Sequence, residues 1–217
     1  MTLHWNGQKF TPVEFLTVSF TEEWLLDVQR VLAFLVHGEP HFEVPTSGST
    51  GRPKRLRHSR ARMDASARAT LDHFQLQPGD RALLALPAKY IGGAMMVVRA
   101  YLGQLHLYLV EPKMCPTLAQ AFDFVPLTPA QYDALRSNSE TESFLRQSHV
   151  LLGGGPVPAY MEHWVDARVT VGYGMTETVS HIALRRLGEL VYKGVGAVTF
   201  ERSDRGTLVI NAPPLPR

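Results

Sequence analysis

The chain is poor in cysteine and has no long apolar run. Cys115 is the single cysteine among 217 residues, which excludes an intrachain disulfide and a metal site built from several cysteines. Residues 1–6 are polar and lack the apolar core of a secretory signal peptide. No apolar stretch approaches the length needed to cross a bilayer. We therefore expect a cytoplasmic protein without a membrane span.

An excess of charge of either sign is also lacking. The formal net charge is +2, while 45% of the residues are apolar, enough for a substantial buried core. One local basic run contains Arg52, Lys54, Arg55, Arg57, Arg60 and Arg62. It is interrupted by Pro53, Leu56 and Ser59 and has no interleaved aromatic residues, so a solvated helix face explains most of it. We expect no nucleic-acid partner.

Two common catalytic motifs are missing. A Walker P-loop needs four residues between its first glycine and Gly-Lys-Ser/Thr, whereas Gly48 and Gly51 are separated by two, and Arg52 and Pro53 precede the lysine. No stretch reads Gly-x-Ser-x-Gly, the nucleophile elbow of α/β-hydrolases. A Walker-type nucleotidase and a serine hydrolase both lose their main support.

What the chain does contain is a loop of small, hydroxyl-bearing residues. Residues 46–54 read Thr-Ser-Gly-Ser-Thr-Gly-Arg-Pro-Lys and follow the apolar run at 42–44. Gly48 and Gly51 permit backbone conformations in which N–H groups turn toward an anion, and Lys54 adds positive charge. By composition alone such a segment is typical of a surface turn. Its chemistry is that of a polyphosphate-binding loop.

A second informative segment lies well downstream. Residues 172–178 read Gly-Tyr-Gly-Met-Thr-Glu-Thr and combine an aromatic ring, a hydroxyl and a carboxylate. These groups suit a site that holds a flat base and a magnesium-phosphate unit. The alternatives are core packing for Tyr173 and Met175 and an exposed loop acid for Glu177. Taken together, the two segments indicate a nucleotide site.

The apolar spacing predicts strands that alternate with helices. Strands are expected at 15–20, 42–44, 82–86, 105–110, 122–125, 149–152, 168–172 and 206–211. Helices are expected from an N-cap at Thr21 to His37, after a cap at Ser59, and at 91–102, 129–135 and 159–165. This order predicts an α/β fold, with mostly parallel sheets flanked by helices and a small β region near the C-terminus. Ligands in such sheets bind beyond the carboxyl ends of strands, where the glycine-rich motifs fall.

Three motifs resemble the signatures of the adenylate-forming superfamily, which includes acyl-CoA synthetases, luciferases and peptide-synthetase adenylation domains. Residues 46–54 and 172–178 are similar to its two signatures, and Leu-Leu-Gly-Gly-Gly-Pro at 151–156 resembles the strand end that borders the adenine. Their order and separation also match, from about residue 42 to the C-terminus. The resemblance implies an N-terminal adenylation domain at 1–211, shortened at its start, and a linker stub at 212–217 that leads to a missing C-terminal domain.

The resemblance also implies which residues bind ATP and magnesium. The phosphates are assigned to Thr46, Ser47, Gly48, Ser49, Thr50, Gly51 and Lys54. The adenine and the rest of the nucleotide are assigned to Gly153, Gly154, Gly155, Tyr173, Gly174, Met175 and Thr176. Glu177 matches the magnesium-binding glutamate, and the implied catalytic set is Lys54, Thr176 and Glu177. Cationic and N–H donors with a carboxylate-held metal are what the approach of two anions requires.

The expected acid pocket departs from the general pattern of the superfamily. Many acyl-CoA synthetases carry an aromatic residue or a histidine after a Leu-Pro step, whereas residues 86–93 read Leu-Pro-Ala-Lys-Tyr-Ile-Gly-Gly. A lysine and a tyrosine there suggest an acidic substrate, since Lys89 could pair with a second carboxylate and Tyr90 could bond it or stack on a ring. Ser180 and His181, just past the second signature, could complete a polar wall, although a lone histidine there is often an ordinary hydrogen-bonding residue. The substrate-binding residues that we expect are Lys89, Tyr90, Gly93, Arg99, Ser180 and His181.

The same segment resembles one branch of the superfamily, the short bacterial o-succinylbenzoate-CoA ligases of menaquinone biosynthesis, whose acid carries two carboxylates. This implies an AMP-forming carboxylate-CoA ligase that uses ATP, Mg²⁺, coenzyme A and a small carboxylic acid. Another aryl or dicarboxylic acid, a carrier thiol as acceptor, and a homodimer stay open. In the family the ribose-binding aspartate and the catalytic lysine come later in the chain. We therefore expect weak nucleotide binding and slow turnover at most, with a non-catalytic AMP-binding module as the alternative.

Overall fold

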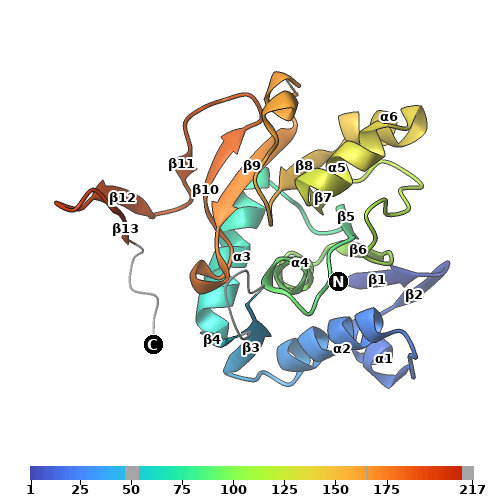
Figure 1. Cartoon of the computed structure of the whole chain (residues 1–217). Helices are drawn as coiled ribbons and strands as arrows, with labels where there is room; N and C mark the ends of the chain where they lie inside the picture. The colour runs from blue at the N-terminus through green and yellow to red at the C-terminus, as the bar shows by residue number, and fades with distance from the viewer. Residues whose placement is uncertain (47–53, 165, 212–217) are drawn as a thin grey trace.

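A single large sheet organises the chain. The computed structural model describes residues 1–46, 54–164 and 166–211. Within them the strand order of this sheet is β11-β10-β9-β8-β7-β5-β6-β1-β2. Its strands are β1 Thr2–Trp5, β2 Gln8–Phe10, β5 Arg81–Leu84, β6 His106–Leu109, β7 Phe124–Leu127, β8 His149–Leu152, β9 Val169–Gly174, β10 His181–Arg186 and β11 Lys193–Gly194. Figure 1 shows the sheet running through the middle of the molecule.

The central strands are parallel and the edges are antiparallel. Pairs β1–β6, β6–β5, β5–β7, β7–β8 and β8–β9 are parallel, while β1–β2, β9–β10 and β10–β11 are antiparallel. The carboxyl ends of parallel strands lie at the same edge of the sheet, and the loops that follow them can surround a ligand there. The predicted fold class, a mostly parallel sheet flanked by helices, is confirmed.

Helices cover both faces of the sheet. Residues of α2 (Glu23–Val36), α3 (Arg60–Phe74) and α4 (Ile91–Leu102) share one buried apolar cluster with Ala82 and Leu84. Residues of α5 (Pro129–Arg136) and α6 (Ser139–Arg146) share the other with Leu83 and Ala85. Successive residues of β5 therefore face opposite clusters, as the period of two in a strand requires. Figure 1 shows α5 and α6 on one side of the sheet and α2, α3 and α4 on the other.

Two small antiparallel sheets stand apart from the main one. They are β3 (His41–Pro45) with β4 (Arg55–Ser59), and β12 (Thr199–Arg202) with β13 (Leu208–Asn211). The second pair is the small β region expected near the C-terminus, and it extends away from the body in Figure 1. The first pair corrects an expectation, because the loop at 46–54 follows a strand of this hairpin and not a strand of the parallel sheet.

The start of the chain differs most from the predicted elements. The strand predicted at 15–20 is wrong: Phe15 lies in helix α1 (Pro12–Thr17), which Thr11 and Glu14 begin with a reciprocal capping box. The N-cap of α2 is Glu22, not Thr21, and its side chain makes no capping bond. The cap at Ser59 is confirmed, since its hydroxyl accepts from the N–H of Arg62. Residues 159–163 form the 3₁₀ helix η1 (Ala159–His163), shorter than the helix predicted there.

No helix within the described ranges has the length and apolar character of a membrane span.

Candidate active site

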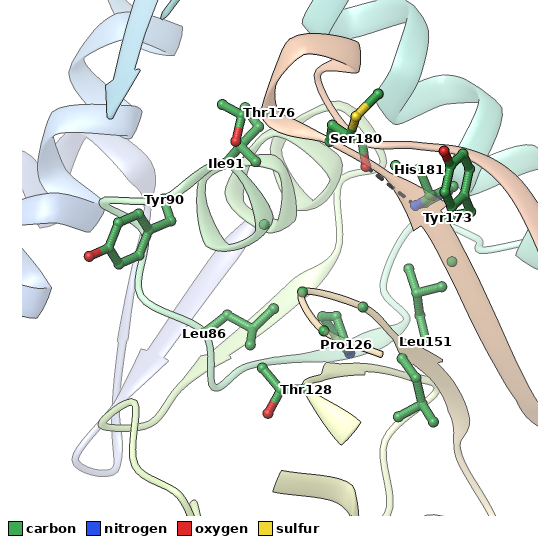
Figure 2. Close-up of a pocket in the computed structure, with 18 of the residues that line it drawn as sticks. Leu86, Tyr90, Ile91, Pro126, Thr128, Leu151, Tyr173, Thr176, Ser180 and His181 are labelled. Carbon is green, nitrogen blue, oxygen red and sulfur yellow. Dashed lines mark hydrogen bonds between the residues drawn. The ribbon is translucent and has the colours of Figure 1, made fainter. Parts of the chain in front are cut away.

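A cavity of about 730 Å³ opens at the carboxyl edge of the parallel strands. Four segments line most of it: the loop between β5 and α4 with the first turn of α4, the end of β7, the end of β8 with the loop that follows it, and the end of β9 with its connection to β10. Thr46, Arg99 and Tyr192 complete the wall. Figure 2 shows Tyr90 and Tyr173 on opposite sides of the cavity, with Leu86 and Pro126 between them. The cavity is large enough for a ligand of nucleotide size.

Most of the residues predicted to bind the nucleotide meet at this cavity. Its lining includes Thr46, Gly153, Gly154, Gly155, Tyr173, Gly174, Met175, Thr176 and Glu177. Lys54 is exposed and does not belong to the lining, although its backbone N–H donates to the Thr46 hydroxyl at 3.2 Å. Ser47, Gly48, Ser49, Thr50 and Gly51 lie outside the described residues. The second signature and the glycine run therefore line the same cavity.

Two glycines of the cavity lining are required for different structural reasons. Gly154 has φ = +79°, a left-handed conformation that favours glycine at the turn after β8. A Cβ on Gly174 would overlap the carbonyl of Ser180, so this glycine lets the end of β9 approach the start of β10. Ser180 and His181 are thereby held beside the second signature.

The turn that carries Glu177 is held in a strained shape. Thr178 Oγ1 accepts from the N–H of Met175 at 2.9 Å and donates to the carbonyl of Ser180 at 2.9 Å, which closes the 3₁₀ turn η2 (Thr176–Thr178). Val179 follows with φ = +72°, an unusual angle for a β-branched residue, and its side chain is buried. Such strain persists where surrounding contacts fix it and is common at functional sites.

His58 lies behind the same turn. It is 3% exposed, and neither of its ring nitrogens has a hydrogen-bond partner among the described residues. Burial, followed by the charge of Arg62, lowers the pKa of His58, which favours the neutral ring. Arg62 also reaches the turn, with its Nη2 donating to the carbonyl of Glu177 at 3.5 Å.

Glu177 fits the part of a carboxylate that holds magnesium on a nucleotide. Its side chain is exposed at the cavity, and the described residues contain no group of three His, Cys, Asp or Glu side chains arranged for a metal. Magnesium on a nucleotide typically uses one or two carboxylates together with phosphate oxygens and water, so a cluster of three is not required. One carboxylate at the mouth of the cavity agrees with that coordination.

Arg99 is the most unusual residue of the cavity. Its side chain is 2% exposed, and its Nη2 donates to the Ser180 hydroxyl at 2.6 Å. Its Nε has no hydrogen-bond partner, and no carboxylate in the described part of the chain lies within ion-pair distance of the guanidinium. Burial lowers the pKa of Arg99 to about 10, so the group stays charged at neutral pH. A buried cation without an anion is costly, which makes an anionic ligand favourable here.

His181 and Ser180 accompany this arginine on the cavity wall. The His181 ring lies between the Ser180 hydroxyl, 3.3 Å from Nδ1, and the Thr70 hydroxyl, 3.2 Å from Nε2. Burial, then the charges of Arg99 and His73, lowers the pKa of His181 to about 3. A neutral histidine here excludes a role as a second cation for the acid.

The residues predicted from the segment 86–93 divide into two groups. Tyr90 and Gly93 line the cavity, as do Arg99, Ser180 and His181 from the rest of the predicted substrate set. Lys89 is exposed and lies outside the lining, with its Nζ 5.6 Å from the ring centre of Tyr90. A Cβ on Gly93 would overlap the carbonyl of Pro87, so glycine brings the first turn of α4 against this loop.

Tyr192 is a cavity residue that the sequence patterns did not reveal. Its ring centre lies 5.9 Å from that of Tyr173, and the Arg185 guanidinium lies 5.1 Å from its ring. Arg185 is in turn fixed by Glu162 through two hydrogen bonds, one of them at 2.8 Å. No motif joins these positions in sequence, because η1, β10 and the following loop meet only in the folded chain.

Comparison with known proteins adds the family. Residues 35–203 match the protein family described as AMP-binding enzyme. A probable 2-succinylbenzoate-CoA ligase of Mycobacterium tuberculosis is 31% identical over 169 residues, which cover 70% of this chain and 41% of that protein. A 2-succinylbenzoate-CoA ligase of Haemophilus influenzae is 27% identical over 186 residues, covering 80% of this chain and 40% of that protein.

Solved structures agree on the fold. An acyl-CoA synthetase (AMP-forming)/AMP-acid ligase II-like protein of Dyadobacter fermentans is similar, with a TM-score of 0.83 and 32% identity, over 93% of this chain and 61% of that one. The o-succinylbenzoate coenzyme A synthetase of Bacillus subtilis, in complex with ATP and magnesium ion, has a TM-score of 0.63 at 20% identity over 77% of this chain and 38% of that one. The chain thus spans 40–41% of these two curated relatives. It belongs to the AMP-binding enzyme family, as its three glycine-rich motifs indicated.

Proposed function

We propose that the cavity binds the adenylate of an aromatic acid that carries a second carboxylate, most simply o-succinylbenzoate. In this proposal the chain supplies the nucleotide and acid walls of an AMP-forming carboxylate-CoA ligase. The support is the meeting of the second signature, the glycine run and Arg99 around one cavity, together with the 2-succinylbenzoate-CoA ligase activity for which the M. tuberculosis and H. influenzae relatives are named.

The buried guanidinium of Arg99 is the observation that carries the proposal. An acid with one carboxylate uses that group on the α-phosphate of ATP, which leaves nothing anionic for a cation deep in the acid pocket. Arg99 has no carboxylate partner among the described residues and can offer N–H groups in the planar geometry that suits a carboxylate. A substrate with a second carboxylate would complete the pair.

The rest of the pocket suits an aromatic ring. Leu86, Ile91, Pro126 and Leu151 supply apolar surface to the cavity, and Tyr90 also belongs to its lining. Apolar walls with a few placed polar groups are the usual composition of a small-molecule site. In the proposal Lys89 is an exposed cation beside Tyr90 that lies outside the cavity lining and makes a smaller contribution to acid binding than Arg99.

The nucleotide residues keep the roles that the family resemblance implies. In the proposal Gly153, Gly154, Gly155 and Tyr173 border the adenine, Thr176 contacts the α-phosphate, and Lys54 with Thr46 and residues 47–51 binds the outer phosphates. Glu177 would hold magnesium, which supplies neutralisation of phosphate charge when it is bound. Gly174 and Met175 complete the wall beside the base.

The proposed reaction has two balanced steps. A carboxylate oxygen of the acid bonds to the α-phosphorus of ATP while the bond to the pyrophosphate oxygen breaks, which gives the acyl-adenylate and pyrophosphate. The sulfur of the coenzyme A thiol then bonds to the acyl carbon, and AMP leaves with the electrons of the broken acyl-oxygen bond. The thiol proton passes to solvent or to the leaving AMP.

Exchange of radioactive pyrophosphate into ATP tests the proposal. We expect exchange that requires o-succinylbenzoate, is not supported by benzoate, and falls at least tenfold in Glu177→Gln, about 1.4 kcal/mol of transition-state stabilisation. Glu189→Gln, a change of an exposed glutamate on a loop, is the matched control. Exchange with benzoate alone would overturn the choice of acid. Tight binding of an adenylate analogue without any exchange would favour the alternative, a module that holds an adenylate without reacting.

A further inference from the structure

We propose that Thr70 is a positioning residue for the acid end of this cavity, because it fixes the tautomer of His181 and, through Ser180, the orientation of the Arg99 guanidinium. The inference rests on the proposed function, since it concerns the same arginine. Thr70 lies on α3 and is completely buried, and nothing in its sequence context connects it with a substrate site.

Three hydrogen-bond contacts join α3 to α4 through His181 and Ser180, and a fourth holds Thr70 within α3. Thr70 Oγ1 lies 3.0 Å from the Ser66 carbonyl and 3.2 Å from His181 Nε2. His181 Nδ1 lies 3.3 Å from Ser180 Oγ, the contact drawn as a dashed line in Figure 2. Ser180 Oγ lies 2.6 Å from Arg99 Nη2. The chain of contacts therefore ends on the buried cation.

The donors and acceptors available define a single direction for this series of hydrogen bonds. The Ser66 carbonyl can only accept, so the hydroxyl hydrogen of Thr70 goes to it, and the Thr70 oxygen must accept from His181 Nε2–H. In a neutral imidazole the other nitrogen is then an acceptor, and Ser180 donates its hydroxyl hydrogen to Nδ1. The lone pairs of Ser180 remain for Arg99, which can only donate.

The charge on Arg99 keeps the imidazole in this neutral form. A second ring proton would place a cation next to Arg99 and would oppose the hydrogen donated by Ser180. Burial, Arg99 and His73 together lower the pKa of His181 to about 3, so the ring stays neutral over the range in which the protein would work. Ser180 consequently has no hydrogen left for the substrate and acts only by holding the guanidinium.

Loss of the Thr70 oxygen should weaken every hydrogen bond in the series from His181 to Arg99. In Thr70→Val the shape of the side chain is kept but Nε2 loses its acceptor, so the ring can take the Nδ1–H tautomer and donate to Ser180. The Ser180 hydroxyl hydrogen is then free to rotate, and the fixed contact to Arg99 is weakened. In Thr70→Ser the oxygen is kept, so this variant controls for the loss of the methyl group.

Nitrogen-15 NMR of histidine side chains, with His181 assigned from its disappearance in His181→Gln, tests the first half of the inference. We expect the Nε2–H tautomer in the wild-type chain and in Thr70→Ser, and a mixture or the Nδ1–H form in Thr70→Val. The Nδ1–H tautomer in the wild-type chain would overturn the inference. This readout needs no ligand and does not depend on the proposed activity.

Calorimetric titration of the same variants tests the second half. A non-hydrolysable o-succinylbenzoyl-adenylate analogue should bind Thr70→Val about tenfold more weakly than wild type, while a benzoyl-adenylate analogue should bind both equally. Equal weakening of both analogues would mean general damage to the fold and would overturn the positioning role, as would wild-type affinity in Thr70→Val. Failure of the wild-type chain to prefer the succinylated analogue would overturn the proposed function, and the tautomer would still decide whether Thr70 fixes His181.

Discussion

The Arg99 guanidinium donates to the Ser180 hydroxyl at 2.6 Å, which joins helix α4 to the start of β10 across 81 positions of sequence. The bond holds a buried cation in the lining of a cavity that the glycine run and the second signature also line. Burial of an arginine without an anionic partner is unfavourable, and a ligand that supplies the anion would offset this cost. The acid specificity of the site therefore centres on this pair.

Two adjacent glycines of α4 should respond oppositely to alanine. In Gly93→Ala the new Cβ would overlap the Pro87 carbonyl, and the forced shift should cost ~1–3 kcal/mol of unfolding free energy. In Gly92→Ala the Cβ would lie 3.6 Å from Leu86 Cδ1, an ordinary contact, and the helix should gain ~0.5–1 kcal/mol. Urea unfolding of the two variants measures the difference. Similar effects at both positions would show that α4 does not pack on this loop as described.

The ion pair between Glu162 and Arg185 should stabilise the part of the chain that carries Tyr192. Glu162 fixes Arg185 with two hydrogen bonds and also accepts from the N–H of Gly188 at 3.1 Å. In Glu162→Gln the Arg185 side chain, only 9% exposed, loses its anion, and we expect a loss of ~1–3 kcal/mol of stability. The Tyr192 ring beneath Arg185 should become more mobile, which tyrosine fluorescence can report.

A surface pair provides the control for that variant. Arg55 Nη1 lies 3.8 Å from Glu43 Oε2, and both side chains are largely exposed. We therefore expect Glu43→Gln to change the free energy of unfolding by less than about 0.5 kcal/mol. If the two glutamates had equal effects on the midpoint of unfolding, Glu162 would be an ordinary surface partner and its link to the cavity would be lost.

The stability of the chain should fall as the pH drops below the ordinary pKa of histidine. Burial lowers the pKa of His181 from its ordinary value of 6.5 to about 3, so between these values the unfolded chain binds a proton that the folded chain excludes. Unfolding is then favoured by up to ~1.4 kcal/mol for each pH unit lost, and the contribution is fully present only above pH 6.5. Urea unfolding at several pH values should give a shallower slope in His181→Gln. An unchanged slope would mean that the ring is solvated and titrates normally.

The sequence predicted the architecture well where local pattern and motif agreed. The central parallel strands and α4 were expected near their observed positions, because their apolar runs are bounded by Gly, Pro or Asp. Residues 15–20 misled the prediction because alternating apolar residues there suit a strand, while the capping box of Thr11 and Glu14 starts a helix earlier. The strands β1, β2, β4, β10, β11 and β12 were missed, since they are short or follow directly on a motif.

The candidate site was predictable only in part. Signature residues such as Tyr173 and Glu177 line the cavity as expected, because the motifs themselves carry that information. The exposed position of Lys89 could not be read from residue type, since one turn of loop decides whether a side chain enters the cavity. Thr70 and Tyr192 carry no local signal, and only tertiary contacts connect them with the site.

The central claim is that Arg99 binds a second carboxylate, and calorimetric titration of two adenylate analogues tests it most directly. We predict that the wild-type chain binds the o-succinylbenzoyl analogue at least tenfold more tightly than the benzoyl analogue, about 1.4 kcal/mol. Arg99→Met, which keeps an unbranched side chain in the pocket, should remove this preference, and Lys89→Ala should keep most of it. A preference that survives in Arg99→Met, or that disappears in Lys89→Ala instead, would contradict the account.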